Sequence, residues 1–272
     1  MANVRLPREA LDRLGREMSG LLGDARQAWR EGRRPWIALS MCLLSAACAA
    51  ADQFASMQPL LTRVGGVYAD LPVTKELARL PLSAFLPTAD LPLWGALLQT
   101  AVVIGLAELV IGPISTVLVA SAGQLLSTMT SRYLIALGTA VVIGLPLSQA
   151  GVLDTGPSGI STAVGGWLLA RRGAYASLAL LVVAIAAAAV LQSNLDGREH
   201  ATALAVGIGA AVIQAPTVRA LPRRAVRGVR SLWPAYEIEY EYEGDPGPRV
   251  EGPVRQPAVR RGRPSARSGG PG

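Results

Sequence analysis

Long apolar stretches separated by short polar segments dominate the pattern of this chain. A helix that crosses a membrane needs about 20 largely apolar residues, because lipid offers no hydrogen-bond partner to an exposed backbone amide. Five stretches approach this pattern: Trp36 to Ala51, Leu91 to Ile111, Ile114 to about Met129, Ala174 to Leu191 and His200 to Ala215. We interpret them as the first, second, third, fifth and sixth membrane spans, and the shorter stretch from Ser158 to Ala170 as the fourth.

A further apolar stretch, from Tyr133 to Leu147, is ambiguous because Arg132 precedes it and Pro146 lies near its end. A seventh crossing at this place would leave one basic cluster on the outer side of the membrane. We therefore expect a re-entrant or interfacial helix before the fourth span, or an extension of the third span. The pattern as a whole predicts an all-α integral membrane protein with a bundle of six transmembrane helices.

Charge along the chain predicts its orientation, because arginine and lysine accumulate in short loops on the cytoplasmic side. Eight arginines precede the first span, and five follow Pro216 before the next acidic residue. The loop from Asp52 to Asp90 and the loop before His200 mix acidic and basic residues. Both termini and the Arg171-Arg172 pair are therefore predicted to be cytoplasmic, and the two mixed loops external.

The spans divide the chain into three predicted regions: an Arg-rich leader (1–34), a transmembrane core (35–217) and a cytoplasmic tail (218–272). The leader carries leucines and a methionine at near-helical spacing, which fits a helix lying on the membrane surface and also a plain soluble helix. The tail is basic at first, then holds an acidic run at 237–243 and Pro, Gly and Arg in low complexity. We expect the tail to be disordered.

Composition narrows the class of protein. Hydrophobic residues make up 51% of the chain, which is too apolar for a soluble domain of this size. Lys75 is the only lysine, and the excess of Arg, Ala and Gly suggests a GC-rich bacterial genome, so the basic charge does not indicate nucleic-acid binding. We expect a multi-pass protein of the bacterial inner (plasma) membrane. Cys42 and Cys48 share the first span and are expected to be small packing residues.

Ser158 is the first candidate for chemistry. Gly156 and Pro157 interrupt the chain before it and Gly159 follows it, so its hydroxyl is predicted to lie at a helix N-terminus. Free backbone amides there can stabilise the oxyanion that forms when a serine attacks a carbonyl. Serine is also a preferred N-cap, so a purely structural role explains the same motif.

His200 is the only histidine, and imidazole is the usual base that activates a serine hydroxyl near neutral pH. With six crossings, the spans that begin at Ser158 and His200 enter the membrane from the same, outer side. The two side chains are therefore predicted to meet. Close packing of two helices in lipid requires small residues, and both spans supply them. On the faces concerned these are Thr162, Gly165, Gly166, Ala203 and Gly207.

Three further polar residues of the predicted spans are candidates for chemistry: Gln99, Glu108 and Gln124. Either glutamine is a candidate donor to an oxyanion. We expect Glu108 to be an interfacial carboxylate bonded to nearby backbone or arginine. Glu108 and the glycine-rich helices are also the only features that suggest a small-solute transporter or channel.

These motifs resemble the rhomboid intramembrane serine proteases, and more closely the divergent rhomboid-like proteins of actinobacteria. The resemblance covers about residues 36 to 215. It rests on a Gly-x-Ser-Gly that begins the fourth helix and a histidine, followed by small residues, that begins the sixth. In this chain those positions are Gly156, Ser158, Gly159, His200, Ala203 and Gly207. Glu108 with Gly112, Gly165-Gly166, Arg171 and the Ser83 to Leu86 segment also resemble family features.

The resemblance implies an endopeptidase that cleaves transmembrane helices near the extracytoplasmic face. Ser158 would be the nucleophile, His200 the general base and then acid, and the Ser158 amide one oxyanion donor, with no metal or cofactor. The family's oxyanion His and Asn are missing around 92–96, and Thr162 replaces a common aromatic residue. The alternative is therefore an inactive rhomboid-like protein that binds transmembrane clients. The sequence leaves the substrate and the oligomeric state open.

Overall fold

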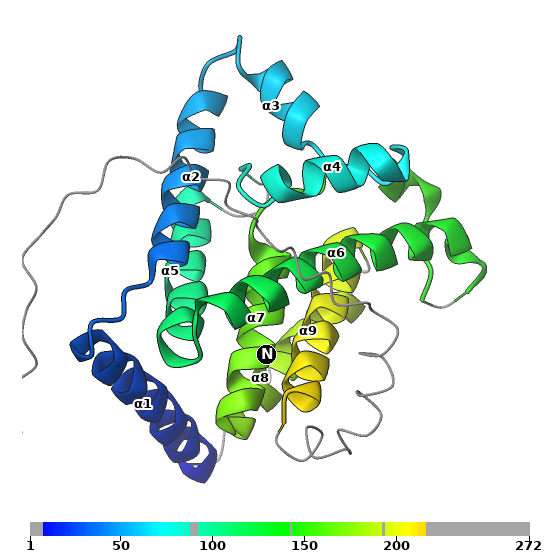
Figure 1. Cartoon of the computed structure of the whole chain (residues 1–272). Helices are drawn as coiled ribbons and strands as arrows, with labels where there is room; N and C mark the ends of the chain where they lie inside the picture. The colour runs from blue at the N-terminus through cyan, green and yellow to red at the C-terminus, as the bar shows by residue number, and fades with distance from the viewer. Residues whose placement is uncertain (1–7, 88–91, 142, 192–193, 216–272) are drawn as a thin grey trace, which may run out of the picture. The chain divides into compact units, whose positions relative to one another are not determined.

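The computed structural model describes residues 8–87, 92–141, 143–191 and 194–215 (Figure 1). Within these ranges the predicted all-α class is confirmed, because every long element is a helix and only Val67 and Asp154 form a β-bridge. The α-helices are α1 (Arg8–Arg30), α2 (Trp36–Asp52), α3 (Gln58–Gly65), α4 (Val73–Ser83), α5 (Leu93–Val110), α6 (Pro113–Leu137), α7 (Ser158–Arg172), α8 (Tyr175–Leu191) and α9 (Leu195–Ile213). The predicted disordered tail lies outside the described residues.

The apolar helices differ in whether they are long and apolar enough to cross a membrane. Among the described residues, one helix, α5, is long and apolar enough to cross a membrane. The apolar helices α2 and α8 are shorter, at 17 residues each. In α8 only Ala189 is buried, and five of its leucines and valines are exposed: Leu180, Val182, Val183, Val190 and Leu191. Cys42 and Cys48 on α2 are free thiols.

The core is built around α7, which packs against α5, α6, α8 and α9. Its residues Ala163, Val164 and Trp167 are fully buried. The helix ends where Gly173 takes a left-handed conformation at φ 67°, which favours glycine because it has no Cβ. Central burial of α7 fixes the position of its first residue, Ser158, relative to the neighbouring helices.

Helices α7 and α9 run parallel, as three levels of contact show. Near their N-termini, Gly159 lies against the side chain of Glu199. Halfway along, Gly207 meets the backbone of Ala163. Near the C-termini, Trp167 Nε1 donates a hydrogen bond of 3.1 Å to Gln214 Oε1. The two N-terminal ends therefore lie at the same end of the bundle.

The first part of the ambiguous segment, Tyr133 to Leu137, continues α6, the helix of the third predicted span, and its other described residues form turns and no separate α-helix. Helix α6 continues to Leu137 and ends at Gly138, where φ is 63°. Two short 3₁₀ turns follow, η1 (Gly138–Ala140) and η2 (Leu147–Gly151). Arg132 does not break the helix because its guanidinium reaches Glu76 Oε2 at 2.7 Å and the Leu71 carbonyl oxygen at 2.6 Å.

The two loops assigned to the outer side contain helices, which corrects their interpretation as loops. The first contains α3 and α4. The second is the first turn of α9, which begins at Leu195 instead of His200 because Asn194 caps it by accepting a hydrogen bond of 3.0 Å from the Gly197 amide. Arg198 and Glu199 are therefore helical residues, and Glu199 is buried.

The leader forms α1, which packs against α5 and α8. Leu21, Ala25 and Ala28 are buried, whereas Leu11 and Met18 are exposed. The Glu17 carboxylate accepts hydrogen bonds from the amides of Ala176 and Ser177 in the first turn of α8. Arg172 forms an ion pair with Asp24. These contacts attach the leader helix to the ends of the core helices.

Glu108 is bonded to backbone, as the sequence predicted. Its carboxylate accepts hydrogen bonds from the Ile37 amide at 3.0 Å and the Ala38 amide at 3.2 Å, so it caps α2. We expect Glu108→Ala to lower the free energy of unfolding by about 2 kcal/mol, because two buried amides lose a charged acceptor. Denaturant unfolding in detergent measures the change. The control is Glu31→Ala, since Glu31 is exposed and bonds only Gln27, and an equal loss there would contradict the capping role.

Candidate functional site

Ser158 is the first helical residue of α7 and follows Pro157, which occupies the N-cap position. Because Pro157 holds the N-cap position, the interpretation of Ser158 as the N-cap is wrong. Gly156 precedes the proline with φ 107°, a conformation that favours glycine. The Ser158 side chain is therefore not needed to begin its own helix.

The loop before Ser158 is held by hydrogen bonds to the segments before and after α4. The Asp154 amide donates to the Val67 carbonyl oxygen at 2.9 Å. The Gly156 amide donates to the Ser83 carbonyl oxygen at 2.8 Å, in the segment that resembled a family feature. The Thr155 hydroxyl donates to the Pro87 carbonyl oxygen at 3.1 Å. The loop is thus fixed by the region that the sequence assigned to an irregular external loop.

His200 lies in the second turn of α9 and is part-buried. It shares a helix face with Ala203 and Gly207, which are both buried, and Gly207 meets α7. The parallel packing therefore places His200 and Ser158 at the same end of two adjacent helices. Among the described residues, no hydrogen bond joins the Ser158 hydroxyl to the His200 imidazole.

The residues proposed for helix packing divide into two groups. A Cβ at Gly207 would overlap the Ala163 carbonyl oxygen, and one at Gly166 would overlap the Leu204 side chain, so both glycines allow α7 and α9 to approach. Ala203 is fully buried on α9. Gly165 instead faces α5 and α8. Thr162 is buried, and its hydroxyl donates back to the Ser158 carbonyl oxygen at 2.9 Å.

The two candidate glutamines have different positions. Gln124 is buried on α6, and its Oε1 atom would lie 3.6 Å from a Cβ at Gly159. The Ser127 Oγ atom would lie at the same distance, and Glu199 Oε1 at 3.2 Å. Gln99 is part-buried on α5 and does not belong to this cluster. The structure therefore brings one of the two glutamines, Gln124, to the start of α7.

Sequence reasoning missed a pair of hydrogen-bonded carboxyl groups beside this site, Asp154 and Glu199. The Ser127 hydroxyl donates a further hydrogen bond of 3.1 Å to Glu199 Oε1. The sequence contained one signal for the burial of Glu199. This residue precedes Ala203 by four positions and therefore shares its buried helix face. No group of three His, Cys, Asp or Glu side chains that could hold a metal ion is found in the described part of the chain.

Burial changes the ionisation of Asp154. Desolvation raises the pKa of this carboxyl group to about 6, the hydrogen bond with Glu199 partly opposes the rise, and the negative charges of Asp196 and Glu76 add to it. Two carboxyl groups form a hydrogen bond with each other only when at least one is protonated. The pair therefore retains a proton that ordinary surface carboxyl groups lose well below neutral pH.

A polar face runs along α6 next to these carboxyl groups. Gln124, Ser127, Thr128 and Ser131 are spaced as one side of a helix and are all buried. Within the described ranges, the Gln124 Oε1, Thr128 Oγ1 and Ser131 Oγ atoms have no hydrogen-bond partner. Unpaired buried polar atoms are rare in native proteins, so this face indicates a functional region more than a packing surface.

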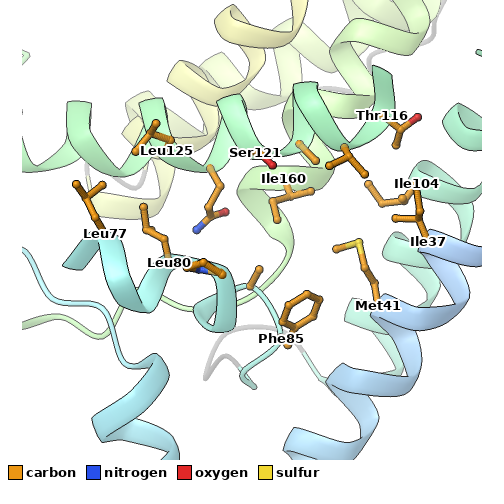
Figure 2. A pocket seen from close by; sticks show the side chains of 15 residues that line it. Ile37, Met41, Leu77, Leu80, Phe85, Ile104, Thr116, Ser121, Leu125 and Ile160 are labelled. Atoms are coloured by element: carbon orange, nitrogen blue, oxygen red, sulfur yellow. The ribbon is translucent and has the colours of Figure 1, made fainter. Parts of the chain in front are cut away.

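An apolar cavity of about 490 Å³ lies beside the start of α7 (Figure 2). Figure 2 shows Ile160 of α7 and Ser121 of α6 on one wall, with Phe85 and Met41 on the other. Gln124 is one of its few polar lining residues. Its volume is in the range of sites that bind organic ligands or apolar side chains. Because Ile160 lies two residues after Ser158, the cavity reaches the same turn of α7.

Comparison with known proteins adds no family to this geometry. No protein-family model matches the chain, and no curated protein matches it either.

Proposed function

We propose that this protein is an intramembrane serine endopeptidase of the rhomboid type, which cleaves transmembrane helices near the extracytoplasmic face. The observation that carries the proposal is the parallel packing of α7 and α9, with Ser158 and His200 at the same end. A nucleophile and the only imidazole of the chain share that end. Such a pair is the minimum that serine catalysis requires.

Membrane insertion is part of the proposal, with α2, α5, α6, α7, α8 and α9 as six spans of a bacterial plasma-membrane protein and both termini in the cytoplasm. The exposed apolar surface of α2, α5 and α8 supports it, because water-soluble proteins rarely expose large apolar patches. Aromatic residues at helix starts add support: Trp36, Trp94 and Tyr175 are all more than 60% exposed. Trp and Tyr at such positions are typical of the two membrane interfaces.

In the proposed reaction, His200 removes the proton from the Ser158 hydroxyl as Oγ attacks the carbonyl carbon of the scissile peptide bond. The amides of Ser158, Gly159 and Ile160 have no acceptor among the described residues, so they are free to donate to the oxyanion. His200 then gives the proton to the leaving amine, and water hydrolyses the ester by the reverse path. We assign Gln124 as a side-chain donor through its Nε2 atom, which requires its amide group to rotate, because Oε1 is the atom that lies beside Gly159.

A closing motion belongs to this mechanism, because no hydrogen bond joins the two catalytic side chains in the described structure. Catalytic hydrogen bonds are often long in free enzymes and shorten when substrate binds. The apolar cavity beside Ile160 offers a place for an apolar substrate side chain. Its occupation would press on the first turn of α7, which carries the nucleophile.

Labelling with a fluorophosphonate probe tests the proposal. We expect the wild-type protein in detergent to be labelled, and Ser158→Ala and His200→Ala to lose labelling by about a hundredfold or more. The matched control is Ser161→Ala, because this serine lies on the same helix and its buried hydroxyl has no partner among the described residues. It should be labelled like the wild type. An unlabelled wild-type protein, or a Ser158→Ala protein that is still labelled, would contradict the proposal.

The second candidate is an inactive rhomboid-like protein that binds transmembrane clients without cleaving them. The missing hydrogen bond between Ser158 and His200 favours it. In that case the wild-type protein resists the probe, and Ser158→Ala leaves client capture and the cellular phenotype intact. A small-solute transporter has lost its main support, since Glu108 caps α2.

A further inference from the structure

A contact between two carboxyl groups joins the loop before Ser158 to α9. This loop precedes the proposed nucleophile, and α9 carries the proposed base. Asp154 lies in the loop four residues before Ser158. Glu199 lies on α9 directly before His200 and is buried. Their side chains share a hydrogen bond, and Ser127 of α6 donates a second one to Glu199 at 3.1 Å. Three elements therefore meet at the Glu199 carboxyl group.

We propose that Asp154 and Glu199 are positioning residues, which hold the Ser158 loop against α9 through a shared proton. This inference rests on the proposed function, because the groups that it positions are the proposed nucleophile and base. The Glu199 carboxyl group bonds to Asp154 and Ser127, and its Oε1 atom lies with the Ser127 Oγ and Gln124 Oε1 atoms within 3.6 Å of the place where a Cβ at Gly159 would stand. Gln124 is 6% exposed, and its Oε1 atom has no partner among the described residues. The cluster therefore has an acceptor for one additional hydrogen-bond donor.

Charged groups on every neighbouring element affect this proton. Asp196 of α9 and Glu76 of α4 oppose the ionisation of Asp154. Arg132 of α6 pairs with Glu76 and so weakens the effect of that carboxylate. Arg198 and His200 flank Glu199 on α9, and the Arg198 Nε atom is buried with no partner in the described part of the chain. The nearby acidic charges favour keeping a proton on the pair.

The sign of the pH dependence follows from the raised pKa of Asp154. When a carboxyl group has a higher pKa in the attached loop than in the detached loop, it stabilises attachment most below its ordinary pKa. This stabilisation is lost as the pH rises through the raised pKa. For Asp154 the decline therefore begins near the ordinary pKa of 3.8 and is complete above about pH 6. The loop loses the contact completely when the last proton leaves the pair and two carboxylates repel each other.

Two substitutions at position 199 separate positioning from simple packing. In Glu199→Gln the amide donates to the Asp154 carboxylate without any titrating proton, so the loop should remain attached at high pH. In Glu199→Ala the donor is lost and the part-buried Asp154 carboxylate is left without this partner. The loop should then detach near neutral pH.

Amide hydrogen exchange of the full chain in detergent, measured by mass spectrometry, tests this prediction. The reporters are the Asp154 and Gly156 amides, which donate to the Val67 and Ser83 carbonyl oxygens and are protected only while the loop is attached. We expect Glu199→Ala to accelerate exchange of residues 152–157 about tenfold or more, and Glu199→Gln to stay within about threefold of wild type. Between about pH 4 and pH 9, corrected for intrinsic rates, the wild-type loop should lose protection and the Gln variant should not.

The proposal is overturned if Glu199→Ala exchanges like the wild type, if the Gln variant exchanges as fast as the Ala variant, or if the wild-type protection does not change with pH. Should the Ala variant fail to fold, the wild-type and Gln pH series decide the question by themselves. Exchange does not require catalysis. A protein that never reacts with the fluorophosphonate probe but shows the expected exchange pattern would disprove the protease and support the positioning pair.

Discussion

Replacing Gly207 by alanine is expected to lower the free energy of unfolding by about 3 kcal/mol. A Cβ at this position would overlap the Ala163 carbonyl oxygen and lie 2.8 Å from its carbonyl carbon. These are backbone atoms of a buried helix, so no flexible side chain can move aside, and α7 and α9 must separate. The shift in the unfolding transition in detergent measures the loss, and probe labelling of Ser158 should fall with it because the two candidate groups move apart.

The control lies two residues away on the same helix. Gly209 has no atom within 4 Å of the place where its Cβ would stand. Gly209→Ala should therefore leave stability unchanged or raise it by up to about 1 kcal/mol, the difference in helix propensity. If both variants have the same stability, α7 and α9 do not pack closely at Gly207.

Replacing Arg132 by alanine is expected to cost about 3 kcal/mol, because it leaves the Glu76 carboxylate without its partner. Glu76 is 1% exposed and its Oε2 atom lies 2.7 Å from the Arg132 guanidinium. Burial raises the pKa of Glu76, although the hydrogen bond and charge of Arg132 oppose the rise. Without Arg132 nothing on this residue's side counteracts the effect of burial, so the pKa of Glu76 should rise further. The loss of stability should therefore be largest at high pH and smaller in acid, where Glu76 takes up a proton.

Denaturant unfolding of Arg132→Ala at several pH values measures this effect. The matched comparison is the double variant Arg132→Met with Glu76→Leu, which removes both charges and should recover most of the lost stability. A single variant as stable as the wild type at every pH would show that the ion pair does not fasten α4 to α6. Equal losses in the single and double variants would assign the effect to packing instead.

The helical core was largely predictable from the sequence. Apolar runs bounded by Pro, Gly and charge placed α2, α5 and α8 within about two residues of their observed ends, because main-chain bonding within a helix is local. The errors occur where polar residues are buried. The start of α9 was placed too late, since Arg198 and Glu199 suggested a loop. Arg132 made the stretch after it ambiguous, yet α6 continues to Leu137 because Arg132 finds its partners at and just before α4.

For the candidate site, the sequence by itself determined the residue types: one serine between glycines, one histidine, and small residues at helical spacing. It also determined the order of the helices. The alternation of charge between loops predicted that Ser158 and His200 lie on the same side of the membrane. Only the tertiary structure decided which polar groups lie around them. The hydrogen bond between Asp154 and Glu199, the approach of Ser127 and Gln124 to Gly159, and the cap that Glu108 gives α2 join residues more than 30 positions apart. Hydropathy describes each residue with its sequence neighbours, whereas the protonation and pairing of a buried carboxyl group depend on atoms that only folding brings near.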